Sequence, residues 1–193
     1  MIAIIDYNAG NTKSVMNALN RLNADFILTA DASAILAADK VILPGVGHAG
    51  SAMAELIKRD LVDTIKKINA PFLGVCVGMQ IMQDWSEEGD TICLGLIPGR
   101  VVKFQSEEYK IPKIGWNTLK DTKGPLFENL SEESYYYFVH SYYSPLNEYS
   151  IATANYIQDY SVAIQKGNIF GLQFHPEKSA IQGAQIIKNF IEL

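Results

Sequence analysis

Four short apolar runs, separated by segments with helical periodicity, limit the possible folds more than any other feature of the sequence. Each run is apolar throughout, which is typical of a strand buried on both faces of a sheet. The alternation of such runs with helical segments predicts a parallel sheet that helices cover on both sides. The expected strands are Ile2–Ile5, Phe26–Leu28, Val41–Leu43 and Phe72–Val75, and the expected helices contain Val15, Leu19 and Leu22, then Leu36, then Ala49–Lys58 and Leu61–Ile68.

The pattern changes after about Ser86. The remaining chain is a series of strand-like segments with little helix between them, which predicts additional, partly antiparallel strands in the C-terminal half. No repeat, low-complexity segment or linker interrupts the sequence, so we expect residues 1–193 to form one domain. The expected strands are Gly99–Phe104, Lys113–Asn117, Tyr135–Val139, Ile151–Ala154, Ser161–Gln165 and Ile169–Phe174, followed by a helix over Ile181–Phe190.

Composition and charge exclude several classes of protein. The net charge of −5 disfavours nonspecific binding to nucleic acids or to anionic membranes. No apolar run approaches the ~20 residues of a membrane-spanning helix. The first apolar run, Met1 to Ile5, lacks a basic start and reads as a strand rather than a signal peptide. The two cysteines have no metal-binding spacing, so we expect a cytoplasmic protein without a metal site or disulfide framework.

A cysteine between two glycines follows the fourth predicted strand. Gly74 and Gly78 stand two positions on either side of Cys76, and a helical pattern begins directly afterwards. This is the G-x-S-x-G pattern of a nucleophile elbow with sulfur in place of oxygen. The glycines allow the chain to turn sharply while the nucleophile stands clear of the backbone. The alternative is that Cys76 is a small core residue, which the flanking glycines disfavour.

A thiol nucleophile needs a base and a group that orients the base. Of the three histidines, only His175 has a carboxylate two positions later, at Glu177. Residues i and i+2 of an extended segment point the same way, and Pro176 biases His175 towards extended geometry. His175 is therefore the expected base and Glu177 its partner. The alternative is a surface loop with an ordinary histidine and glutamate.

Acyl chemistry also needs N–H donors for the developing oxyanion. The backbone N–H of Val77, which follows the nucleophile, is the first expected donor. The loop Pro44–Gly47, with Val46 and Gly47 at its end, is the expected source of the second. Loops after parallel strands open at the same edge of the sheet, so this loop and Cys76 are expected to be neighbours. The alternative is a tight strand-to-helix connection that contacts no ligand.

These segments together resemble the class I, triad-type glutamine amidotransferases. The resemblance rests on Gly74–Gln80, on Phe174–Glu177 and on Pro44–Gly47, and it covers the whole chain. It implies a flavodoxin-like three-layer α/β fold with a central, mostly parallel sheet, and no cofactor. It also implies that Cys76 attacks the side-chain amide of glutamine, that His175 and Glu177 assist, and that a glutamyl thioester is hydrolysed by water.

Within this family, the chain is similar to the glutaminase subunits of imidazole glycerol phosphate synthase. The similar segments include Gly95–Val102, Gly115–Asn117, Tyr137–Tyr142 and Lys178–Ser179. The resemblance implies a heterodimer in which ammonia passes to a (βα)8-barrel cyclase subunit. That subunit forms imidazole glycerol phosphate and aminoimidazole carboxamide ribonucleotide in histidine biosynthesis.

The resemblance also implies roles for residues outside the triad. It places Gln80, Glu88, Ser141 and Tyr142 around the amino-acid end of glutamine. It places Asn11, Trp116, Tyr137 and Lys178 at the partner interface or the channel mouth. The chain departs from the family at His48, which follows the Pro44–Gly47 loop where many members have alanine. We expect no catalytic role for His48, His140 or Cys93.

Three other functions remain compatible with parts of the pattern. A paralogous amidotransferase could supply ammonia to a different synthase, such as one that amidates a surface sugar. A non-catalytic docking subunit could share the fold, although the intact Cys76, His175 and Glu177 disfavour it. A cysteine peptidase is disfavoured because nothing in the sequence indicates a peptide-binding groove.

Overall fold

A seven-stranded sheet forms the centre of the molecule in the computed structural model, which describes residues 1–8, 11–131 and 134–193. The strand order is β11-β12-β13-β4-β3-β1-β2. The five strands from β13 to β2 run parallel, and β12 and β11 extend this sheet with antiparallel pairing. Their bounds are β1 Ile2–Ile5, β2 Phe26–Thr29, β3 Lys40–Gly45, β4 Phe72–Cys76, β11 Ser150–Tyr156, β12 Gln158–Lys166 and β13 Ile169–Leu172.

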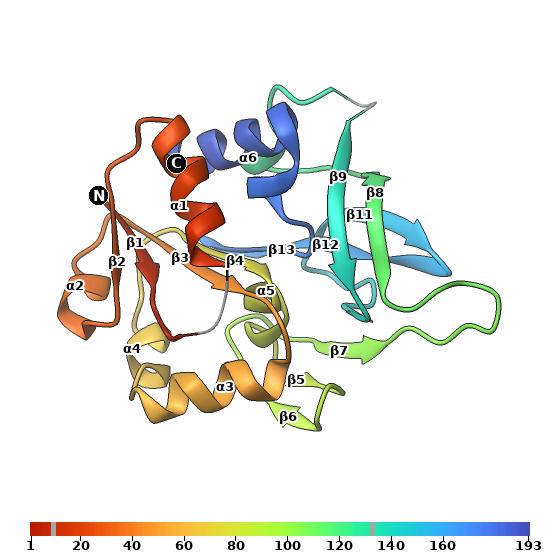
Figure 1. The fold of residues 1–193 in the computed structure, drawn as a ribbon, viewed down its shortest axis with the longest axis horizontal. Helices are drawn as coiled ribbons and strands as arrows, with labels where there is room; N and C mark the ends of the chain where they lie inside the picture. The colour runs from red at the N-terminus through yellow and green to blue at the C-terminus, as the bar shows by residue number, and fades with distance from the viewer. Residues whose placement is uncertain (9–10, 132–133) are drawn as a thin grey trace.

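Helices cover both faces of this sheet, as Figure 1 shows with α1 and α6 above it and α3, α4 and α5 below. The helices are amphipathic, and their apolar sides form the core with the strands. In α1, for example, Val15, Ala18 and Leu19 are buried. The three-layer α/β fold is therefore confirmed. The bounds are α1 Thr12–Arg21, α2 Ala32–Leu36, α3 Ala49–Lys58, α4 Val62–Lys66, α5 Val77–Ile81 and α6 Ala180–Glu192, with short 3-10 helices η1 Pro125–Phe127 and η2 Pro176–Lys178.

Two smaller sheets, formed by strands between Trp85 and Tyr143, stand beside the main sheet. One has the order β10-β7-β5-β6, and the other pairs β8 with β9. Three of these strands are only two residues long, too short to show any periodicity, and the sequence did not predict them. The bounds are β5 Trp85–Ser86, β6 Thr91–Ile92, β7 Arg100–Lys103, β8 Lys113–Thr118, β9 Tyr135–His140 and β10 Tyr142–Tyr143.

Strand register brings the predicted site residues to one edge of the main sheet. Gly45, at the end of β3, is opposite Cys76, at the end of β4. On the other side of β4, Leu172, the last residue of β13, is opposite Val75. His175 lies three residues after the end of β13 and directly precedes η2. Because these strands are parallel, their carboxyl ends meet at one edge, where ligands bind in α/β sheets. Within the described residues, none of the helices is long and apolar enough to cross a membrane.

Candidate active site

Cys76 occupies a sharp turn between β4 and α5. Its φ of 55° and ψ of −111° lie in a region that non-glycine residues rarely adopt. The two flanking glycines are required by close backbone packing. A Cβ atom on Gly78 would lie 2.1 Å from the carbonyl oxygen of Leu43, and one on Gly74 would lie 2.8 Å from the carbonyl of Gly78. The turn therefore has the geometry of a nucleophile elbow.

His175 and Glu177 form a buried pair beside this turn. His175 Nδ1 lies 2.8 Å from Glu177 Oε1, and the two side chains are 1% and 2% exposed. The Glu177 carboxylate can only accept, so Nδ1 of His175 carries the hydrogen of this bond. Nε2 is therefore the ring nitrogen that can take a proton from another group. The backbone N–H of His175 donates to the Tyr137 carbonyl at 2.9 Å, which ties the pair to β9.

The surroundings of His175 favour its protonated form. Burial alone lowers the pKa of the imidazole, but interactions with Cys76 and Glu177 outweigh burial and raise the pKa of His175 to about 9. His175 Nε2 is buried and receives no hydrogen bond from the described residues. A group near the thiol with a free nitrogen and a raised proton affinity is suited to remove the proton from Cys76.

The raised pKa of His175 predicts a pH dependence of stability. An unfolded histidine titrates near about 6.5, whereas the folded value is about 9. The stabilisation is therefore fully present below about pH 6.5 and is lost as pH rises through about 9. We expect the free energy of unfolding, measured with urea, to fall more across this window in the wild type than in His175→Gln. Equal losses in the two proteins would contradict the assignment.

A cavity of about 240 Å³ opens beside Cys76. Cys76 is only 3% exposed but lines this cavity, which has room for a small amino acid. Every residue that the resemblance implied for glutamine binding or the oxyanion also lines it. The lining residues are Val46, Gly47, Cys76, Val77, Gln80, Glu88, Pro112, Val139, His140, Ser141 and Tyr142.

Two of the proposed oxyanion residues have suitable backbone positions. Val77 is the first residue of α5, and the first N–H groups of a helix have no acceptor within the helix. Gly47 has a φ of +92°, which L-residues rarely adopt, and among the described residues no atom lies within 4 Å of the position of an added Cβ. Both residues line the cavity next to Cys76, so their amides remain candidates for the oxyanion donors.

Gln80 is held by hydrogen bonds within the protein. Its Nε2 atom donates to the Tyr142 carbonyl at 3.1 Å and to Gln173 Oε1 at 3.0 Å. Both hydrogens of the amide are therefore engaged, and Oε1 is the atom left for a ligand. Glu88 also has a protein partner, because its Oε2 accepts from the N–H of Ala49 at 2.7 Å.

Three of the four predicted interface residues lie together. The Trp116 and Tyr137 rings meet edge to face at 5.8 Å, and Lys178 Nζ lies 5.8 Å from the Tyr137 ring centre. The Tyr137 ring is in turn 6.4 Å from that of His175, so this cluster reaches from the surface to the triad. Asn11 caps the N-terminus of α1, with its side chain accepting from Ser14 N.

Two residues near Cys76 were missing from the sequence prediction. Gln173 Nε2 lies 3.8 Å from Cys76 Sγ, and the Tyr7 hydroxyl donates to the Pro44 carbonyl at 2.6 Å. Burial, with a smaller contribution from Cys76, raises the pKa of Tyr7, which therefore remains a donor that fixes the start of the Pro44–Gly47 loop. The available signal was their position at the ligand-binding edge. Tyr7 lies two residues after the predicted strand Ile2–Ile5, and Gln173 is the next-to-last residue of the predicted strand Ile169–Phe174.

The remaining histidines and the second cysteine have structural contacts. His48 caps α3, and its Nδ1 accepts from Gly50 N at 3.0 Å. Burial lowers the pKa of His140 to about 4, so the ring is neutral and Nδ1 donates to the Tyr142 carbonyl at 2.7 Å. Burial raises the pKa of Cys93 to about 11, which leaves its thiol protonated.

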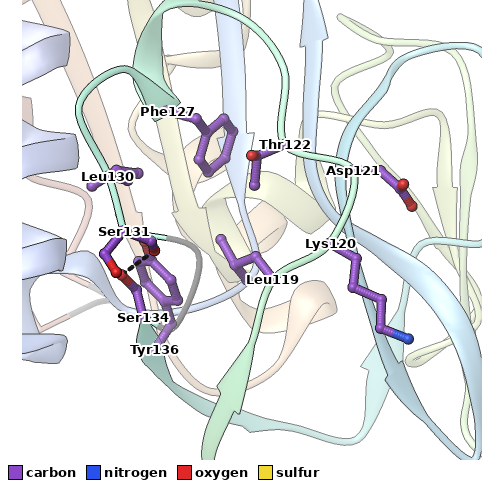
Figure 2. Close-up of a pocket in the computed structure, with 9 residues that line it drawn as sticks. All are labelled: Leu119, Lys120, Asp121, Thr122, Phe127, Leu130, Ser131, Ser134 and Tyr136. Carbon is purple, nitrogen blue, oxygen red and sulfur yellow. Dashed lines mark hydrogen bonds between the residues drawn. The ribbon is translucent and has the colours of Figure 1, made fainter.

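A second cavity, of about 270 Å³, lies away from Cys76 beside the segment that follows β8. Leu119 and Phe127 line it, while the charged side chains of Lys120 and Asp121 at its rim point away from them (Figure 2). Asp121 Oδ2 instead accepts from Thr153 Oγ1 at 2.9 Å. None of the lining residues drawn in Figure 2 directs a charged group into this cavity, so we assign no site to it.

Comparison with known proteins gives consistent results across the whole chain. The family model described as "Glutamine amidotransferase class-I" matches residues 3–193. The chain is 45% identical over 194 residues to imidazole glycerol phosphate synthase subunit HisH of Bacteroides fragilis, covering 100% of this chain and 99% of that protein. It is 44% identical to the protein of the same name from Vibrio cholerae, covering 100% of this chain and 98% of that protein.

Solved structures match the fold at low sequence identity. A putative GMP synthase subunit from Thermoplasma acidophilum superposes with a TM-score of 0.75 at 22% identity, covering 99% of this chain and 92% of that one. A crystal structure described as a glutamine amidotransferase superposes with a TM-score of 0.76 at 16% identity, covering 100% and 98% of the two chains.

Proposed function

The chain belongs to the class-I glutamine amidotransferase family, and we propose that it is the glutaminase subunit of an imidazole glycerol phosphate synthase. The observation that carries this proposal is that three features lie together around Cys76 at one edge of the main sheet. Cys76 lies in a nucleophile elbow, His175 is paired with Glu177 beside it, and the cavity wall contains the residues expected to bind glutamine. The relatives with 44–45% identity carry the name of that subunit.

The geometry supports hydrolysis in two steps. The Cys76 thiol gives its proton to His175 Nε2, and the sulfur attacks the side-chain amide carbon of glutamine. The amides of Val77 and the Val46–Gly47 segment stabilise the oxyanion, and His175 returns the proton to the leaving ammonia. Water then attacks the glutamyl thioester with His175 as base, which releases glutamate and restores the thiol. Glu177 holds the imidazole in the required tautomer throughout.

We further propose that the ammonia passes to a (βα)8-barrel cyclase bound at the exposed face of β8 and β9. Ile114, Trp116 and Tyr135 on this face are 64%, 53% and 59% exposed, which is unusual for large apolar side chains that lie together. The backbone of β9 contacts the active site directly. The Tyr137 carbonyl accepts from His175 N, and the Val139 carbonyl lies 3.9 Å from Cys76 Sγ.

This shared strand predicts that the partner controls the glutaminase. The isolated chain should be nearly idle, because docking on β9 is needed to adjust the Val46 amide and the triad. Trp116→Ala should weaken partner binding by about tenfold or more, since exposed aromatic residues at an interface centre contribute most of the affinity. Titration of each protein with the barrel partner, with glutamate release as readout, measures both effects.

Trp85→Ala is the matched control, because Trp85 stacks on Arg100 within the sheet that contains β5. Full glutaminase activity of the isolated chain, or equal binding by Trp116→Ala and the wild type, would contradict the proposed coupling.

Complementation distinguishes this function from its alternatives. Rescue of a histidine auxotroph that lacks its own glutaminase subunit supports the proposal. Failure of rescue, together with glutamine hydrolysis in the presence of another synthase, would identify a paralogous amidotransferase. Failure of a glutamine analogue to protect Cys76 from alkylation would favour a non-catalytic docking subunit.

A further inference from the structure

Gln173 is a fully buried polar residue next to the sulfur of Cys76. It lies between the end of β13 and His175, and 0% of its surface is exposed. Its Nε2 atom is 3.8 Å from Cys76 Sγ. A buried amide that contacts a reacting atom requires a reason, because burying a polar group costs free energy unless it is hydrogen-bonded.

Neighbouring hydrogen bonds fix which end of the Gln173 amide faces the sulfur. The Tyr142 carbonyl can only accept, so Gln80 must direct its NH2 group towards it. The other hydrogen of this NH2 group points to Gln173, which therefore presents its oxygen to Gln80 at 3.0 Å. The NH2 group of Gln173 is consequently the end that faces Cys76.

The Tyr142 carbonyl also accepts a hydrogen bond from a second donor. Neutral His140 donates from Nδ1 to the Tyr142 carbonyl at 2.7 Å, and its Nε2 lies 3.2 Å from the Tyr160 hydroxyl. The Tyr142 carbonyl thus accepts from both His140 and Gln80, and the donor direction runs from Gln80 through Gln173 to Cys76. It ends with an N–H group pointing at the sulfur.

We propose that Gln173 is a catalytic residue whose side-chain N–H donates a hydrogen bond to the Cys76 thiolate and stabilises it. The proposal rests on the proposed glutaminase function and adds Gln173 to His175 as a group that acts on the sulfur. In the neutral state, the thiol donates to the Val139 carbonyl, whose oxygen lies 3.9 Å from Sγ, and the Gln173 N–H donates to the sulfur. When the proton moves to His175, the Gln173 bond becomes charge-assisted and strengthens.

Several titratable groups surround the sulfur and must be separated from this effect. His175 follows β13, Tyr7 follows β1, and Glu88 and His140 line the same cavity. His175 attracts a thiolate, whereas a negative Glu88 opposes one. Gln173 has no titration of its own, so its removal shifts the pH midpoint of thiol reactivity without adding a new transition to the profile.

The test is the rate at which iodoacetamide alkylates Cys76 as a function of pH, followed on the Cys76 peptide by mass spectrometry. For Gln173→Met we expect a higher pH midpoint and about tenfold slower alkylation at pH 7, because a charge-assisted bond is lost. Gln83→Met is the control, because Gln83 is also fully buried and bonded to a side chain, Ser144, without contacting Cys76. An unchanged midpoint in folded Gln173→Met, or an equal shift in Gln83→Met, would overturn the proposal.

A measurement on the wild type covers the case in which Gln173→Met does not fold. The side-chain NH2 proton of Gln173, observed by 15N NMR, should move downfield with the same pH midpoint as alkylation. A signal that does not change across this range would overturn the proposal. Neither measurement uses glutamine hydrolysis or a partner, so a failure of the proposed function would appear separately, as absent turnover with normal thiol chemistry.

Discussion

Replacing Cys76 with alanine should abolish glutamine hydrolysis while leaving ammonia-dependent synthesis by the complex intact. The nucleophile cannot be replaced by the oxyanion donors or by His175 alone, so we expect a loss of at least about a thousandfold in glutamate release. The partner's reaction needs only ammonia, and an added ammonium salt should support it at the wild-type rate. The two assays, run on the same complex, separate loss of the nucleophile from loss of assembly.

Cys93→Ala is the matched control for this experiment. Cys93 is also buried, but its Sγ donates to the Thr91 carbonyl and it has no flanking glycine pair. The control should retain full glutamine-dependent activity. Glutaminase activity in Cys76→Ala, or its loss in folded Cys93→Ala, would refute the assignment of the nucleophile.

Gly78→Ala should cause a large loss of stability, although it adds only one methyl group. The added Cβ would lie 2.1 Å from the Leu43 carbonyl oxygen, an atom of the sheet backbone that cannot rotate away. Relief requires α5 to move from β3, which disrupts the elbow and its packing. We expect the free energy of unfolding, measured with urea, to fall by about 3 kcal/mol or more.

Gly167→Ala is the comparison that isolates this clash. Gly167 has a φ of +60°, and no atom of the part of the chain that the structure describes lies within 4 Å of its added Cβ, so alanine there introduces backbone strain alone. We expect a loss of about 1 kcal/mol at that position. If the two variants were equally stable, close packing of the elbow would not be the reason for the glycine at position 78.

The parallel core could be predicted because its strands are short and apolar throughout. Ala49–Lys58 matches α3 at both ends, and Phe72–Val75 misses only the last residue of β4. Leu61–Ile68 was too long, because the regular part of α4 ends at Lys66 while the apolar spacing continues to Ile68. The predicted strand to Phe174 also overran β13, which ends at Leu172 before the chain turns towards His175.

The site was predictable where chemistry depends on local spacing, and not where it depends on contacts across the fold. The elbow and the His175–Glu177 pair are each contained within a few consecutive residues. The contact of Gln173 with Cys76 joins residues 97 positions apart, and the bond from Tyr7 to Pro44 joins residues 37 apart. Such contacts leave no periodic signal, and they exist only because β1, β3, β4 and β13 end at the same edge.

The central claim is that glutamine acylates Cys76. The most direct test is to mix glutamine with the chain bound to its barrel partner, quench with acid during turnover and examine the Cys76 peptide by mass spectrometry. We predict a glutamyl adduct on Cys76 in the wild type and none in Cys76→Ala. Active turnover of a glutamine substrate with no adduct on Cys76, or an adduct on another residue, would contradict the mechanism.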